Sequence, residues 1–471
     1  MKPELILPGG DLERVKIAFF YGADAVYVGL NRYSLRKTEV RFSFAELKEA
    51  IEYAHKLSKR IFVTFNIFAH NEQIEELKRD LAKVADYKPD AFIISDPGIV
   101  NLAQRFAPEI PIHLSTQANT TNVESVRFWE KQGVKRIVLA RELSLEEIKE
   151  IHEAVPKMEL EAFVHGAMCI SYSGRCLLSA YMTGRKANLG DCAQPCRWNY
   201  RVYSSNDSEK STDDNSSSLH SNNNFYLEEK MRTGEYYPIE ESEDGTTIIS
   251  SKDLRLVRYL PEILQAGVTG LKIEGRNKSE YYLATTTYAY RRALKYIEQG
   301  NYRSIEKEIL EKELEKLNYR GYTTGLLFSD AKKGETTDSR KHKKKWEYLG
   351  IVTKNQLPTT SQATPPAAIP SDRPNNLQVG RTVEESPKKN FLHPARDTKT
   401  IGYEIIVKNK IANGDVVEVL TPEGVHEDKV ISILDLSGKP LEEINPGKED
   451  QKAIVYLSKT YPENSIIRRK T

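Results

Sequence analysis

Cysteine is nearly absent from this chain of 471 residues. There are four cysteines, and all of them lie in one window, at Cys169, Cys176, Cys192 and Cys196. Two disulfides would suit a secreted protein, and redox dithiols usually occur as C-x-x-C, a motif that this sequence lacks. Buried structural cysteines would not all fall in one window. The clustering therefore predicts that the four thiols act together as ligands of a metal site.

Long hydrophobic runs are also missing. The hydrophobic fraction is 39%, the mean hydropathy is −0.55, and no window holds the roughly 18 apolar residues that a membrane helix requires. The N-terminal stretch MKPELILPGG is too short in apolar residues for a signal peptide. We therefore expect a cytoplasmic protein with reduced thiols and no membrane partner.

Neither sign of charge is in large excess. The chain has 69 basic and 67 acidic side chains and a net charge of +2. Binding to a nucleic acid would therefore depend on local patches. The run RKHKKKW, at 340–346, is a candidate for contacts with nucleic-acid phosphates. A solvated surface run is the alternative.

Short apolar runs alternate with helical patterns along the first part of the chain. The runs are mostly continuous, as expected for strands buried on both faces of a parallel sheet. Ser43 with Glu46, and Ser144 with Glu147, form capping boxes at the starts of two helices. The runs are ELIL at 4, DAVYVG at 24, RIFVTFNIF at 60, AFIIS at 91, PIHLS at 111, RIVLA at 136 and LEAFVHG at 160.

Two more strand–helix units follow after a gap. TTIIS precedes KDLRLVRYLPEILQAG, and GLKIEG precedes EYYLATTTYAYRRALKYIEQG. The repeated alternation predicts an α/β fold, a (β/α)8 TIM-like barrel, and a doubly wound open sheet is the alternative. Later runs such as GYEIIVKN and AIVYLSK predict a small C-terminal β-barrel.

The predicted domains are a barrel over 1–335 and a β-barrel over 346–471. Each contains a polar, low-complexity insertion, at 204–224 and 355–399, which we expect to be disordered because it cannot bury enough apolar surface.

Polar side chains follow the predicted strands, at the edge where barrel enzymes build their sites. The alternative is that some of them only cap helices or bond loops. They are Asn66, Asp96, Gln117, Arg141, Glu142, His165 and Glu274.

The spacing of the cysteines favours one kind of metal site. Structural zinc sites use two close pairs, and only Cys192 and Cys196 resemble such a pair. Iron–sulfur clusters are held by cysteines alone, so the spacing favours a cluster over zinc. Arg175 and Arg197 each neighbour a cysteine, where they would offset thiolate charge, receive an anionic substrate or form ordinary salt bridges.

Residues 161–179 resemble a known family signature. They fit the pattern E-x-F-x-x-G-[SA]-[LIVM]-C-x4-G-x-C-x-[LIVM]-S of the collagenase-like peptidase family U-32. YGADAVYVG, HLSTQAN and LKIEGRNKSEYY resemble the branch of prephenate-dependent tRNA uridine hydroxylases. The resemblance extends over roughly residues 1–330.

The resemblance implies a barrel with a 4Fe-4S cluster, and hydroxylation of the wobble uridine in the tRNA anticodon loop to 5-hydroxyuridine, without molecular oxygen and with prephenate. It makes Cys169, Cys176, Cys192 and Cys196 the cluster ligands, with Cys196 the least secure, because the fourth ligand lies elsewhere in some relatives. A partner or paralogous subunit of the same family is a further expectation.

Specific roles follow from this reading. Arginines suit the two carboxylates of prephenate. His165 would move protons near neutral pH. An aromatic side chain would stack on the splayed base, and the alternative is that this side chain only packs in the core. The predicted catalytic residues are His165, Lys272 and Glu274, and the predicted substrate-binding residues are Gln117, Arg141, Arg175, Arg197, Trp198 and Arg276.

Two other functions stay open. A peptidase of family U-32 is the first, although H-E-x-x-H and G-x-S-x-G are both absent. A nucleophilic Cys169 paired with His165 would leave three clustered cysteines unexplained. The second is a non-catalytic iron–sulfur partner of another hydroxylase.

Overall fold

The structure of the chain is a computed structural model. It describes residues 2–30, 32–33, 42–168, 252–328, 345–356, 400–447 and 450–471, and the backbone of 224–228, 236–242 and 245–247. These residues belong to two compact units, Met1–Lys345 and Trp346–Thr471.

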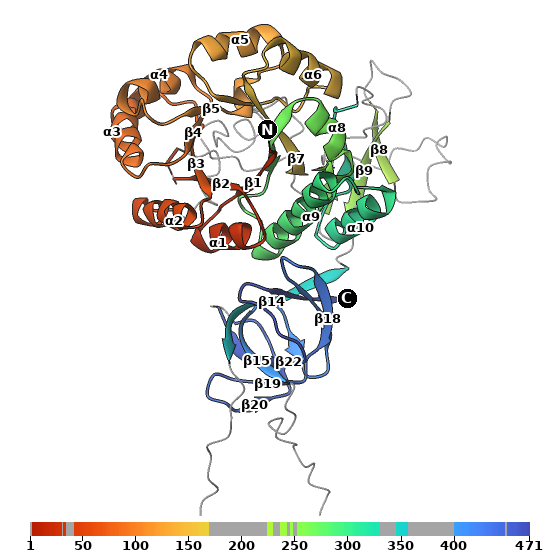
Figure 1. The fold of residues 1–471 in the computed structure, drawn as a ribbon. Coiled ribbons are helices and arrows are strands. Elements are labelled where there is room, and N and C mark those ends of the chain that lie inside the picture. Colours follow the sequence, from red (N-terminus) through yellow and green to blue (C-terminus); the bar gives the residue numbers. More distant parts are fainter. Residues whose placement is uncertain are drawn as a thin grey trace, which may run out of the picture. The chain divides into compact units, whose positions relative to one another are not determined.

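The first unit is built on a closed barrel of eight parallel strands (Figure 1). Seven strands follow one another around the barrel in chain order, and the eighth pairs with both the first and the seventh. This closure confirms the predicted TIM-like barrel and excludes the open sheet. The barrel strands are β1 (Glu4–Pro8), β2 (Ala25–Gly29), β3 (Arg60–Phe65), β4 (Ala91–Ile94), β5 (Ile112–Leu114), β6 (Arg136–Val138), β7 (Glu159–Ala167) and β12 (Val268–Ile273).

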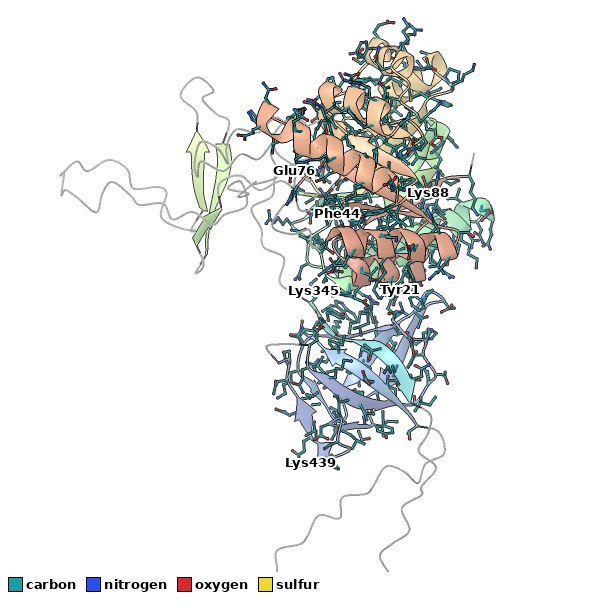
Figure 2. The ribbon with its side chains drawn as sticks, turned by 90° about the vertical axis from the view of Figure 1, so that its left-hand side faces the viewer. Tyr21, Phe44, Glu76, Lys88, Lys345 and Lys439 are labelled. Atoms are coloured by element: carbon teal, nitrogen blue, oxygen red, sulfur yellow. The ribbon has the colours of Figure 1, made fainter. Side chains whose placement is uncertain are left out.

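Helices form a ring outside the strands (Figure 1). In Figure 2, the labelled Glu76 lies in the first turn of α3 (Ile74–Ala85), and the labelled Lys88 follows the end of this helix. The helices are α1 (Leu12–Phe20), α2 (Phe44–Lys56), α3 (Ile74–Ala85), α4 (Pro97–Phe106), α5 (Val123–Lys131), α6 (Leu145–Ala154), α8 (Leu260–Gln265), α9 (Glu280–Glu298) and α10 (Ser304–Leu314), with 3-10 turns η1 (Asn71–Gln73), η2 (Thr116–Ala118) and η6 (Val257–Tyr259).

Both predicted capping boxes are confirmed. The hydroxyl of Ser43 accepts a hydrogen bond from the backbone N–H of Glu46, whose carboxylate accepts one from the N–H of Ser43. The same exchange joins Ser144 and Glu147 at the start of α6. These bonds satisfy N–H groups that a helix leaves unpaired in its first turn.

The first two residues of the predicted strand at TTIIS are not part of the barrel. They lie in β10 (Gly245–Thr247), which pairs with β9 (Tyr236–Ser242) and, through it, with β8 (Asn224–Glu228) in a separate antiparallel sheet. The rest of TTIIS lies outside the described residues, as does the predicted insertion at 204–224 except for Asn224, the first residue of β8.

The helix predicted after TTIIS is wrong at its start. Residues Asp253–Arg255 form β11, which pairs antiparallel with the end of β7 and parallel with β13 (Tyr322–Thr323), and α8 begins only at Leu260. The segment DLRL alternates polar and apolar residues, which is the period of a strand. Leu254 and Leu256 are accordingly buried.

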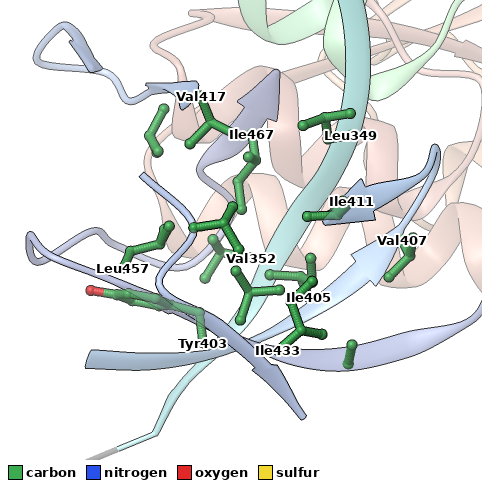
Figure 3. Close-up of a cluster of buried hydrophobic side chains, with 14 of the residues drawn as sticks. Leu349, Val352, Tyr403, Ile405, Val407, Ile411, Val417, Ile433, Leu457 and Ile467 are labelled. Atoms are coloured by element: carbon green, nitrogen blue, oxygen red, sulfur yellow. The ribbon is translucent and has the colours of Figure 1, made fainter. Parts of the chain in front are cut away.

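The second unit is a curled antiparallel sheet with its own apolar core. In Figure 3, side chains that include Val352, Tyr403, Ile405 and Leu457 point toward one another from neighbouring strands. In sheet order the strands are β18 (Val425–Lys429), β17 (Val416–Leu420), β23 (Ile466–Lys470), β14 (Trp346–Gln356), β15 (Ile401–Val407), β22 (Lys452–Leu457), β19 (Ser432–Leu434) and β20 (Pro440–Leu441), with β16 (Ile411–Ala412) and β21 (Glu443–Ile444) as a separate pair.

Asn355 and Gln356, the first residues of the insertion predicted at 355–399, are the last residues of β14. Residues 357–399 lie outside the described residues. Among the residues that are described, no helix is both long and apolar enough to cross a membrane.

Candidate functional site

The carboxyl ends of the barrel strands meet at one mouth, and polar side chains gather there. Because the strands are parallel, residues that follow β3, β4, β5 and β12 are brought to the same end of the barrel. Below this mouth, six buried side chains form a hydrophobic cluster inside the barrel. They are Ile6, Ala25, Tyr27, Phe62, Ala91 and Ile93.

Four residues at this mouth form what we term the amide cluster: Asn66, Ser95, Ser115 and Gln117. All four are buried. The amide oxygen of Gln117 accepts hydrogen bonds from Asn66 Nδ2 at 3.1 Å and from the hydroxyls of Ser95 and Ser115, each at 2.9 Å. These contacts join the ends of β3, β4 and β5. The cluster carries no formal charge and is therefore suited to neutral polar groups.

Two charged residues, Glu274 and Arg276, follow β12 at the same mouth. Arg276 Nη1 donates a hydrogen bond to Thr64 Oγ1 at 3.3 Å, and its guanidinium lies 5.7 Å from the ring centre of Tyr27. The Tyr27 hydroxyl lies 3.1 Å from the carbonyl oxygen of Ile273 and 3.3 Å from Glu274 Oε2. Burial, together with the charge of Glu274, raises the pKa of Tyr27 well above its usual value, so the phenol stays protonated.

Arg141 follows β6 and packs against β7. Its guanidinium lies 4.0 Å from the ring centre of Phe163, and Nη1 donates a hydrogen bond to the carbonyl oxygen of Ala167 at 3.1 Å. The predicted substrate-binding residues Gln117, Arg141 and Arg276 therefore all lie just beyond the carboxyl ends of barrel strands.

Lys272 is held inside the barrel. Its ammonium group lies 2.7 Å from Glu161 Oε1 and 4.4 Å from the ring centre of Tyr27. Glu161 is 0% exposed and also lies 3.3 Å from Arg136. Burial by itself would raise the pKa of Glu161, but Lys272 and Arg136 outweigh it and lower that pKa. Lys272 thus neutralises a buried carboxylate.

His165 lies among three tyrosine side chains. Its ring centre lies 5.9 Å from that of Tyr282, 5.6 Å from Tyr290 and 5.7 Å from Tyr322. Burial, helped by the positive charges of Arg255 and Lys278, lowers the pKa of His165 to about 3. The imidazole is therefore neutral at physiological pH.

Several predicted residues lie outside the described part of the chain. They are Cys169, Arg175, Cys176, Cys192, Cys196, Arg197 and Trp198, together with 340–344 of the basic run. The end of β7 at Ala167 nevertheless places the first cysteine two residues beyond a barrel strand. In the described ranges no group of three or more His, Cys, Asp or Glu side chains is arranged to hold a metal ion.

Sequence reasoning missed Ser95, Ser115 and Tyr27. The signal for the serines was the period of two along a strand, which places Ser95 on the same face as Ala91 and Ile93, inside the barrel. The neighbouring Asp96 was singled out instead. It caps α4 by accepting a hydrogen bond from the N–H of Ile99, as the alternative reading of these polar residues expected.

Comparisons with known proteins identify close relatives. A model of "Peptidase family U32" matches residues 10–337, and a model of the "Peptidase family U32 C-terminal domain" matches residues 393–468. The "tRNA hydroxylation protein P" of Escherichia coli (strain K12) is 39% identical over 443 residues, which cover 90% of this chain and 87% of the relative.

Two further relatives match shorter stretches of the chain. The "tRNA hydroxylation protein P1" of Bacillus subtilis (strain 168) is 40% identical over 354 residues, 74% of this chain and 77% of the relative. The "23S rRNA 5-hydroxycytidine C2501 synthase" of Escherichia coli (strain K12) is 33% identical over 338 residues, 70% of this chain and 46% of the relative.

Proposed function

The chain belongs to peptidase family U32, and we propose that it is an enzyme that hydroxylates tRNA. The observation that carries the proposal is the similarity to two relatives named as tRNA hydroxylation proteins, one of which matches 90% of this chain. A third relative is named as a synthase of 5-hydroxycytidine in ribosomal RNA. Hydroxylation of an RNA base is the reaction that these names share.

We further propose that the base is the wobble uridine, that the product is 5-hydroxyuridine, and that the reaction uses prephenate and proceeds without molecular oxygen. Two guanidiniums at the mouth, those of Arg141 and Arg276, support the choice of a co-substrate with two carboxylates. The neutral amide cluster lies at the same mouth and suits the base rather than the anion.

The four cysteines would hold a 4Fe-4S cluster. Four thiolates are the donor set that such a cluster requires, and all the cysteines of the chain follow β7, which ends at the mouth of the barrel. When bound, a cluster would supply electron transfer or a Lewis-acidic iron beside the substrate.

Glu274 is the proposed proton acceptor. With water as the source of oxygen, conversion of C5–H to C5–OH releases two protons and two electrons; the electrons would pass to a separate electron acceptor, and a carboxylate at the mouth is suited to accept the proton that leaves C5. The Tyr27 hydroxyl, 3.3 Å from Glu274 Oε2, orients that carboxylate. His165 has a pKa of about 3 and so does not carry a proton near neutral pH. We assign it to the packing of β7 against α9 and β13.

The experiment that tests the proposal is a nucleoside analysis. We expect deletion of the gene to remove 5-hydroxyuridine and its derivatives from total tRNA, as measured by mass spectrometry. The wild-type gene should restore them and a Cys169→Ala copy should not, whereas Lys48→Ala on the outer face of α2 should behave as wild type. Unchanged nucleosides in the deletion strain would contradict the proposal and favour the peptidase or the non-catalytic partner.

The role of prephenate is tested separately with purified protein. Under anaerobic conditions, tRNA from the deletion strain should gain 5-hydroxyuridine only when prephenate is added. Hydroxylation that needs oxygen but not prephenate would reject this part of the proposal while leaving tRNA hydroxylation intact.

A further inference from the structure

We propose that Asn66 and Gln117 read the Watson–Crick edge of the uracil that the enzyme modifies. The inference rests on the proposed function, because it assigns a contact to the RNA base of that reaction. It starts from two buried amide groups, at 7% and 8% exposure, at the mouth of the barrel. Among the residues that the structure describes, one half of each amide has a hydrogen-bond partner and the other half has none.

Gln117 offers a fixed hydrogen-bond donor. Its oxygen accepts from Asn66 Nδ2 at 3.1 Å and from Ser95 Oγ and Ser115 Oγ at 2.9 Å each. Three contacts to one side of the amide hold its rotamer and leave the amino group, Nε2, on the other side. Within the described ranges Nε2 donates to no protein acceptor, so the fold positions this donor without using it.

Asn66 offers the matching acceptor. Its Nδ2 is bonded to Gln117, and its Oδ1 is buried without a hydrogen-bond partner among the described residues. The backbone of Asn66 is also held in place, because its N–H donates to the carbonyl oxygen of Tyr33 and its own carbonyl oxygen lies 3.3 Å from Ser95 Oγ. A buried acceptor without a partner is costly, and a ligand N–H removes that cost.

A uracil edge provides the complementary groups. Its N3 carries a hydrogen, which would be donated to Asn66 Oδ1, and it is flanked by two carbonyl oxygens, either of which would accept from Gln117 Nε2. Cytosine has no hydrogen on N3, so its lone pair would face the oxygen of Asn66. Prephenate fits poorly here, since carboxylates require cations and an amide oxygen would repel them.

The test compares two anticodon stem–loop RNAs that differ only at the wobble base, uridine or cytidine. Affinity of the full-length protein for each RNA is measured, together with formation of 5-hydroxyuridine from the uridine RNA and of 5-hydroxycytidine from the cytidine RNA. Wild type should prefer the uridine RNA by about tenfold or more, because the cytidine RNA leaves Asn66 Oδ1 unpaired. Gln117→Glu and Asn66→Ala should lose most of this preference and bind the cytidine RNA as before.

Matched variants separate this role from folding. Gln104→Glu makes the same chemical change on the exposed surface of α4 and should keep the preference. Thermal melting shows whether each variant is folded. If Asn66→Ala or Gln117→Glu unfolds, Ser95→Ala and Ser115→Ala replace them. These changes remove hydrogen bonds to Gln117 Oε1 but keep both amide groups, so they should weaken the preference for the uridine RNA only partially.

The outcomes distinguish this inference from the function on which it rests. A wild-type protein that hydroxylates neither RNA rejects the proposed function. Wild-type hydroxylation with an unchanged base preference in the folded variants overturns only the assignment of Asn66 and Gln117 as the base-reading pair.

Discussion

Buried charges are the most informative single residues of the barrel interior. Arg136 contacts three carboxylates, those of Glu4 at 2.6 Å, Glu159 at 2.6 Å and Glu161 at 3.3 Å. Glu161 is the most buried of them and also holds Lys272. A charge in such a place is tolerated only while its partners remain, since isolated burial of an ion is strongly unfavourable.

Replacement of Glu161 is the first prediction at this scale. Glu161→Gln leaves Lys272 and Arg136 buried with one carboxylate fewer and should destabilise the barrel by about 3–5 kcal/mol. Glu159→Gln is the matched control, because Glu159 contacts the same Arg136 but its side chain is 36% exposed. Its effect should stay below about 1 kcal/mol. Urea unfolding followed by circular dichroism measures both, and equal losses would contradict the prediction.

The depressed pKa of His165 predicts how stability depends on pH. The folded state keeps this imidazole neutral down to its pKa of about 3, whereas the unfolded state takes up a proton below its usual value of about 6.5. Between these values the unfolded state binds more protons, so stability falls as pH falls, by up to about 1.4 kcal/mol per pH unit from this residue.

His165→Phe should remove that dependence. The free energy of unfolding of wild type and variant is compared at pH 7 and pH 5. Relative to wild type, His165→Phe should be more stable at pH 5 than it is at pH 7. For His70→Phe, at an exposed position, the difference in free energy of unfolding from wild type should be the same at both pH values. An identical pH dependence in wild type and His165→Phe would show that His165 is not held neutral.

At the scale of elements, β7 connects the barrel to the cysteine window. Its end pairs with β11 as well as with β12, and the register slips near His165. Gly166 lies at this irregularity with φ of +108°, a conformation that L side chains rarely adopt. A Cβ there would lie 2.5 Å from the carbonyl oxygen of Glu274, so glycine is required both for its φ and for the close approach of β12.

Gly166→Ala should therefore disturb the path from β7 to Cys169. We expect a loss of roughly 1–3 kcal/mol in stability and a fall in the absorbance near 400 nm that an iron–sulfur cluster would give. Gly300→Ala is the control, since Gly300 also has a positive φ, +68°, but nothing lies within 4 Å of the added Cβ. If Gly166→Ala retains the absorbance and stability of wild type, as Gly300→Ala should, the close contact at Gly166 contributes neither to stability nor to cluster binding.

For the whole molecule, the chain divides into two units that each have a core. The barrel unit ends at Lys345 and the curled sheet begins at Trp346. The basic run 340–346 spans this boundary, and the tRNA hydroxylation proposed here requires a large polyanionic substrate. A run of positive charge in the sequence is suited to bind phosphates and to make binding depend on salt.

Neutralising the run tests that role. Replacing Lys343, Lys344 and Lys345 with Gln should weaken tRNA binding and reduce the slope of log K against log salt by about 1 for each phosphate that the protein no longer neutralises. The control replaces Lys48, Lys149 and Lys312, which lie exposed on outer helices, and should leave the slope unchanged. An unaltered slope in the first variant would assign the run to a solvated surface.

The sequence by itself determined the barrel, the two helix caps and the family, because each depends on short-range patterns. Apolar runs, capping boxes and the signature around Cys169 are complete within a few residues of one another. The same local logic placed Gln117, Arg141, Glu274 and Arg276 at the carboxyl ends of strands.

Only the tertiary structure decided what those side chains contact. Closure of β12 onto β1 and β7 brings Glu274 to Tyr27 and Lys272 to Glu161, residues far apart in the chain. The same closure places His165 among three tyrosines, and the pairing of β4 with β3 and β5 completes the amide cluster with Ser95 and Ser115, two serines that were not predicted as site residues. Such contacts follow from strand register and barrel closure, because these set distances between segments that share no local sequence pattern.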